Sequence, residues 1–93
     1  SIIYAPEADR DVTVLHARFL AYSEAAAAAF MVRLSLAEER IEARPKTYRL
    51  LSDGGTRRYS FRINRTSYLI DYQVEPTQIV VLRVWHGRQD RPE

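Results

Sequence analysis

Apolar positions follow two different periods along the chain, and the change falls at Pro45. Before Pro45, apolar residues recur every three or four positions, which is the period of an α-helix with one buried face. The first such stripe predicts a helix from Pro6 and is formed by Ala8, Val12, Leu15, Phe19 and Tyr22. The second predicts a helix after Ser23 and is formed by Ala27, Phe30, Met31, Leu34, Ala37 and Ile41.

The residues that flank these stripes support both helices. Pro6 suits the first position of a helix, and the acidic residues that follow it favour the positive end of the helix dipole. Ser23 is a typical N-cap, and Pro45 ends the second helix because proline cannot continue one. Because the junction between them is so short, the two helices should form an antiparallel hairpin.

Beyond Pro45, apolar side chains alternate with polar ones, which is the period of a β-strand with one buried face. In residues 56–63 one face carries Tyr59, Phe61 and Ile63, and the other carries Arg58, Ser60 and Arg62. Further strands are predicted at 67–74 and 78–86, and a short one at 1–4. Residues 78–86 are apolar on both faces, which is typical of a central strand. The order strand, helix, helix, three strands predicts one α+β domain over residues 1–93, with the hairpin on one sheet face.

The composition is that of a small folded domain. Hydrophobic residues make up 46% of the chain, which is enough to form a core. Cysteine is absent, so neither a disulfide nor a thiolate metal site can form, and His16 and His86 have no zinc-site spacing. No apolar run approaches the ~20 residues of a membrane span. We therefore expect a cytoplasmic protein without a metal or other cofactor.

Charge is distributed unevenly between the two halves. Residues 1–44 hold five Arg and seven acidic residues, a net charge of −2, whereas residues 45–93 hold nine basic and five acidic residues, a net charge of +4. All the basic residues except Lys46 are Arg, whose guanidinium pairs well with carboxylates and phosphates. The second half therefore favours an acidic partner, either a nucleic acid or an acidic polypeptide.

The last predicted strand ends in "VWHGRQD", residues 84–90. Trp85 is expected to anchor the core or the helix layer. Gly87 is expected to supply a backbone conformation that other residues avoid, so that Arg88 and Arg91 project into solvent. This predicts an exposed C-terminal surface of mixed charge.

Several of these stretches together resemble the RelE/ParE toxin superfamily of bacterial type II toxin–antitoxin systems. The matching stretches are "YAPEADRDV", the Ala-rich second helix that ends at "RP", "YSFRI", "SYLIDYQV" and "IVVLRVWHGRQD". The resemblance implies a mostly antiparallel sheet with the N-terminal strand beside the last one. It also implies a cognate antitoxin whose C-terminal segment wraps around the toxin.

The superfamily divides by target, and one position bears on the choice. RelE-like members cut mRNA in the ribosome without a metal, and they carry an Arg in the middle strand, within a Tyr/His-Arg-Leu-Val-Tyr pattern. ParE-like members act on DNA gyrase. Here the stretch reads "YLIDY", residues 68–72, so Leu69 stands at the Arg position and cannot stabilise a charged phosphate. Asp71, on the same strand face, would repel phosphate.

The favoured hypothesis is a ParE-like toxin that inhibits DNA gyrase by protein–protein contact and performs no chemistry itself. The expected target-binding residues are His86, Gly87, Arg88 and Arg91. The cognate antitoxin is expected to bind the hairpin and the Arg-rich sheet edge through Arg58, Arg62, Phe19 and Phe30. No sequence-specific DNA binding by the toxin alone is expected, because the helical half is acidic.

Two alternatives stay open. One is a RelE-like endonuclease that acts on mRNA in the ribosome, with a rearranged site formed by His86, Arg62, Arg83 and Arg88. The other is a superfamily member without toxicity that binds only an antitoxin.

Overall fold

Two helices and five strands follow one another in the predicted order, with one strand more than expected. The computed structural model describes all residues, 1–93, as β1 (Ile2–Tyr4), α1 (Pro6–Tyr22), α2 (Glu24–Ala43), β2 (Arg49–Leu50), β3 (Arg57–Ile63), β4 (Thr66–Val74) and β5 (Ile79–His86). The additional strand, β2, was missed because two residues are too few to show a period. Neither helix has the length and hydropathy that crossing a bilayer requires.

The strands form one mixed sheet in the order β1-β5-β4-β3-β2. β1 runs parallel to β5, with Ile3 opposite Val80, and the other neighbouring pairs are antiparallel. The structure thus confirms the α+β fold and the place of the N-terminal strand beside the last one. β5 lies between β1 and β4, as its two apolar faces predict.

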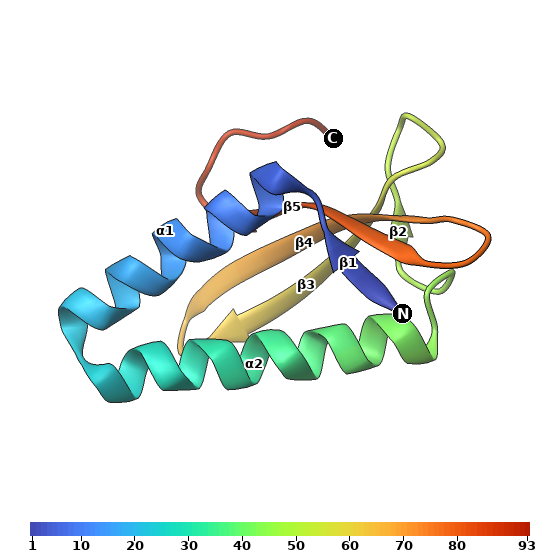
Figure 1. The fold of residues 1–93 in the computed structure, drawn as a ribbon. Helices are drawn as coiled ribbons and strands as arrows, with labels where there is room; N and C mark the ends of the chain where they lie inside the picture. The colour runs from blue at the N-terminus through green and yellow to red at the C-terminus, as the bar shows by residue number, and fades with distance from the viewer.

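The two helices form an antiparallel hairpin that covers one face of the sheet (Figure 1). Ser23 alone separates them, and its extended backbone turns the chain between the two axes. Its hydroxyl accepts a hydrogen bond from the Ala26 amide at 3.0 Å, which confirms the predicted N-cap of α2. Pro6 occupies the first turn of α1, as predicted.

A single core fills the space between the hairpin and the sheet. Phe30 of α2 is fully buried, and its ring lies 5.0 Å from that of Phe19 and 6.3 Å from that of Tyr68. The core comprises Ala8, Leu15, Phe30, Leu34, Ala37, Ile41, Tyr59, Phe61, Tyr68, Ile70, Tyr72, Ile79, Val81 and Val84. Burial raises the pKa of the Tyr72 hydroxyl to about 12, and this hydroxyl donates to the Pro45 carbonyl at 2.6 Å.

Two residues of the predicted helix stripes are exposed. Tyr22 is 88% exposed at the end of α1, and Met31 is 41% exposed one position after Phe30. A helix turns by about 100° per residue, so Met31 cannot share the buried face with Phe30. Both assignments to the core were wrong, and both side chains lie on the surface.

A bulge in β5 decides what the two faces of the sheet carry. Asp71 pairs with Arg83 and Tyr72 pairs with Val81, so Leu82 has no partner on β4. The extra residue shifts the alternation of β5 by one position. Val81 and Val84 therefore both face the helices, whereas Trp85 lies on the opposite face with Leu69. Trp85 is buried, as expected of an anchor of the core or the helix layer, but it packs on the sheet face that the helices leave open.

Candidate functional site

A buried ionic cluster lies on the sheet face that the helices leave open. Asp71 of β4 accepts hydrogen bonds from Arg58 Nε at 2.6 Å, Arg58 Nη2 at 2.9 Å and Trp85 Nε1 at 2.8 Å. Arg58 and Asp71 are each 5% exposed. The hydrogen bonds to Asp71 raise the pKa of the Arg58 guanidinium, so the guanidinium is held in its charged form. We call Arg58, Asp71 and Trp85 the Asp71 cluster.

The C-terminal residues cover this cluster. Arg58 Nη2 donates to the Pro92 carbonyl at 2.8 Å, and the Ser52 amide donates to the Glu93 carbonyl at 3.0 Å. Arg49 forms an ion pair with the Glu93 carboxylate at 3.0 Å. Figure 1 shows the chain after β5 turning back along the molecule. The tail therefore packs on the protein instead of projecting from it. Arg88 is exposed as predicted, but Arg91 is half-buried and donates to the Gly87 carbonyl at 2.9 Å. Arg58 is not the exposed contact that strand alternation suggested.

The turn after β5 brings His86, Gly87 and Arg88 to the surface. The Arg88 amide donates to His86 Nδ1 at 3.1 Å, and the His86 amide donates to Gln89 Oε1 at 2.7 Å. The imidazole lies edge-on to the Tyr68 ring at 5.4 Å. His86 is thus half-buried and oriented by backbone and aromatic contacts, while Arg88 is exposed. Target binding by these residues remains a prediction.

Gly87 is required by a close approach to β4. Its amide donates to the Ser67 carbonyl at 2.7 Å, and a Cβ at this position would lie 2.7 Å from the same oxygen. Its φ is not in the left-handed region, which among the glycines only Gly54 adopts. The expected reason for this glycine was wrong, because a side chain would collide with β4 rather than strain the backbone.

The residues of the alternative ribonuclease site are not brought together. Arg83 forms a bidentate pair with Asp11 of α1, at 2.7 and 3.0 Å, and covers the Trp85 ring at 4.0 Å. Arg62 donates to the Arg65 carbonyl at 2.9 Å in the β3–β4 turn. A polar cleft at the end of β5 is lined by His86 and Arg88 but by neither Arg62 nor Arg83. No group of three or more His, Asp or Glu side chains is placed to hold a metal ion.

The position that bears on nuclease chemistry holds a buried apolar side chain. Leu69 lies on the open face of the sheet, opposite Trp85, and is 7% exposed. Asp71, two residues on, is neutralised by Arg58. This part of the sheet therefore presents no free cation that could stabilise a phosphate.

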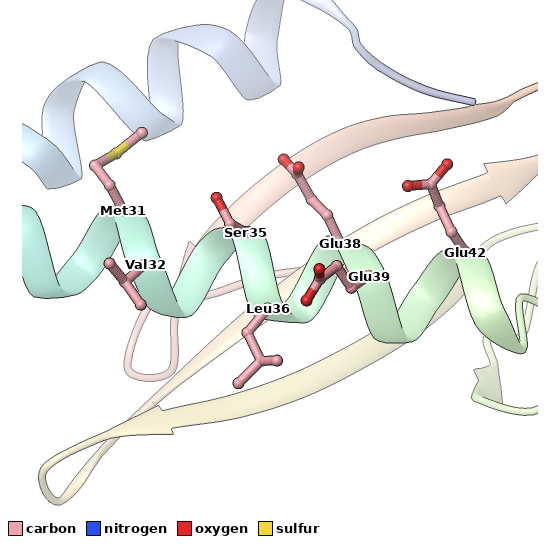
Figure 2. A pocket seen from close by; sticks show the side chains of 7 residues that line it. All are labelled: Met31, Val32, Ser35, Leu36, Glu38, Glu39 and Glu42. Atoms are coloured by element: carbon pink, nitrogen blue, oxygen red, sulfur yellow. The ribbon is translucent and has the colours of Figure 1, made fainter.

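A shallow groove of about 560 Å³ runs along the outer side of α2 (Figure 2). Its apolar part is formed by Met31, Val32 and Leu36, and its acidic part by Glu38, Glu39 and Glu42. Val32 is 67% exposed. Sequence reasoning missed this surface. The signal was present, because three consecutive apolar residues, Phe30, Met31 and Val32, cannot all lie on one buried face of a helix.

The two phenylalanines expected to bind the antitoxin lie in different environments. Phe30 has no exposed surface, so its assignment as an antitoxin contact was wrong. Phe19 is half-buried and lines a second groove together with Tyr22, Tyr68 and His86. Arg62 is exposed at the end of β3. Phe19 and Arg62 thus remain candidates for contact with a partner.

Comparison with known families agrees with this architecture. A protein-family model described as "ParE toxin of type II toxin-antitoxin system, parDE" matches residues 2–91, nearly the whole chain. The match runs from β1 through the turn after β5, and it confirms the resemblance drawn from the sequence. A search of curated proteins found no match.

Proposed function

Since this chain belongs to the ParE toxin family of type II toxin–antitoxin systems, we propose that it arrests growth by binding DNA gyrase, without chemistry of its own. The surface at His86, Gly87 and Arg88 would contact the target. The family also implies a cognate ParD antitoxin as partner.

The observation that carries this proposal is the burial of Leu69 beside the neutralised Asp71 cluster. Metal-free RNA cleavage needs a cation at the reacting phosphate together with a proton acceptor and a proton donor. Arg58 and Arg83 are both held by carboxylates, at 2.6 and 2.7 Å. That leaves His86 with Arg65 and Arg88 in the polar cleft. A single imidazole does not supply both the proton acceptor and the proton donor, which supports a binding surface better than a nuclease site.

Two assays on the purified toxin test the target. With gyrase and plasmid, we expect cleaved DNA to accumulate; with translating ribosomes, we expect mRNA to stay intact. Substituting His86→Ala should weaken the gyrase effect and leave the fold unchanged by circular dichroism. Codon-dependent mRNA cuts that disappear in the same variant would support the RelE-like alternative. A folded protein that has no effect on gyrase or on mRNA but binds antitoxin would support the non-toxic alternative.

For the antitoxin, we propose that an amphipathic helix binds the groove on α2. Met31, Val32 and Leu36 offer it an apolar stripe. Tyr4 donates to Glu38 and the N-terminus pairs with Glu42, so Glu39 is the carboxylate of the groove that is open to a Lys or Arg side chain on the partner. Arg58, which was also expected to contact the antitoxin, is buried and is not part of this proposal. An extended antitoxin segment can still reach Arg62.

Substituting Val32→Asp should weaken antitoxin binding about tenfold or more, which corresponds to about 1.4 kcal/mol. The new carboxylate would lose its hydration against an apolar partner, and it would add negative charge to a groove that is already acidic. Isothermal titration calorimetry measures the effect. Val14→Asp, on an exposed residue of α1 (50% exposed), is the matched control and should bind as the wild type does. Equal losses in both variants would contradict the assignment of the groove.

A further inference from the structure

The hairpin turn, the β3–β4 turn and the end of β5 lie at one end of the molecule (Figure 1). Five arginines without acidic partners lie in or near these segments. They are Arg18, Arg33, Arg62, Arg65 and Arg88. Arg33 donates to the Arg62 carbonyl at 2.7 Å, which joins α2 to the β3–β4 turn. The arginines that form ion pairs are instead Arg49, Arg58 and Arg83. Glu24 and Asp90 are exposed in the same segments, so five arginines against two carboxylates leave the surface at this end with a net positive charge.

A polar cleft of about 200 Å³ opens within this end. It is lined by Arg65, Thr66, Ser67, His86, Gly87 and Arg88, and by no carboxylate. The two guanidiniums and the two hydroxyls make no hydrogen bond within the chain, so they are available to a ligand. Because Gly87 has no side chain, the turn after β5 can approach Ser67 of β4 closely, and both residues line the cleft. Hydrogen-bond donors without a counter-charge are suited to an anion, and forked guanidiniums to a phosphate.

An aromatic groove of about 400 Å³ adjoins the cleft, and His86 lines both. Its rings come from Phe19, Tyr22 and Tyr68, and Arg18 lies at its border. Tyr22 is 88% exposed, so its ring is open to contact. Aromatic rings next to a cationic track are the arrangement that binds single-stranded nucleic acids, because bases stack on the rings while arginines hold the backbone.

We propose that this end of the protein binds a single strand of DNA, with a phosphate in the polar cleft and a base against Tyr22. A duplex keeps its bases stacked inside and offers none to the aromatic groove. An acidic peptide could place a carboxylate in the cleft, but it carries no base to stack on the aromatic rings. The choice of DNA over RNA rests on the proposed function, since gyrase acts on DNA. The binding is independent of base sequence.

Fluorescence anisotropy with a labelled oligothymidine strand tests this without gyrase or antitoxin, at about 50 mM salt where phosphate contacts are strong. Arg65→Ala/Arg88→Ala should weaken binding about tenfold or more and reduce the slope of log K against log salt by about one for each arginine. Tyr22→Ser should weaken it about fivefold, whereas Tyr22→Phe should not. Arg44→Ala/Lys46→Ala removes two exposed charges beyond the other end of α2 and is the matched control.

Several results would overturn the inference: equal losses in the control, wild-type affinity of the cleft variant, duplex or oligouridine bound as tightly as oligothymidine, or equal competition by an acidic peptide. Circular dichroism and antitoxin titration verify that each variant is folded. Because the binding assay contains no gyrase, the two proposals fail separately. Gyrase inhibition without strand binding removes only this inference, and strand binding without gyrase inhibition removes only the proposed target.

Discussion

Substituting Phe30→Ala should lower the free energy of unfolding by about 3–5 kcal/mol. Phe30 has no exposed surface, and its ring contacts those of Phe19 and Tyr68 at the centre of the hairpin–sheet interface. Its removal forfeits the transfer of a large apolar side chain from water and leaves a cavity that rigid neighbours cannot fill. Since domains of this size are stable by roughly 5–15 kcal/mol, the variant should be close to unfolding.

Chemical denaturation followed by circular dichroism measures this loss. Val32→Ala, two residues further along α2 and 67% exposed, is the control, with an expected change within about 0.5 kcal/mol. A loss below about 1 kcal/mol for Phe30→Ala would mean that the α2 stripe does not form the core.

Substituting Asp71→Ala should cost about 3–5 kcal/mol, because it leaves the Arg58 guanidinium buried without its counter-charge. The Arg58 and Asp71 side chains are only 4% and 7% exposed, so water cannot replace the lost carboxylate without opening the structure. Trp85 Nε1 would lose its acceptor as well. The C-terminal tail, which binds Arg58 through Pro92, should also loosen.

A double variant separates the loss of the pair from the loss of one partner. Arg58→Met/Asp71→Leu removes both charges and keeps apolar volume, so it should recover much of the stability that Asp71→Ala loses. Equilibrium unfolding in urea compares the variants with the wild type. If the double variant is less stable than Asp71→Ala, the cluster stabilises the protein through more than its ion pair, and the expected cause of the loss is wrong.

The location of the charged pair matters for function as well as stability. Arg58 and Asp71 occupy the centre of the open sheet face, where a nuclease would need accessible cations. Because each neutralises the other's charge and the tail covers both, the charged pair on this face stabilises the fold and is not accessible to a substrate. The accessible basic residues instead lie at the hairpin end, around Arg65 and Arg88.

The fold was predictable because its signals are local. The 3.6-residue period before Pro45 and the two-residue period after it follow from backbone geometry that consecutive residues encode. Ser23 caps α2 as predicted, since a cap depends on a hydroxyl and amides within one turn. The family, too, was recognisable from stretches such as "VWHGRQD", and Leu69 marked the departure from the RelE-like pattern.

Burial on the second face of the sheet was decided by contacts between distant segments. Strand alternation placed Arg58 on the correct face, but it is residues far along the chain, Pro92 and Glu93, that cover it. The bulge at Leu82 places both Arg83 and Trp85 on the open face of the sheet. It arises from pairing with β4 and has no signal in the sequence around it. Gly87 is required by the Ser67 backbone, and the cationic end forms only where β3, β4, β5 and the hairpin converge. Alternation along a strand determines which way a side chain points, and packing of remote chain determines whether water reaches it.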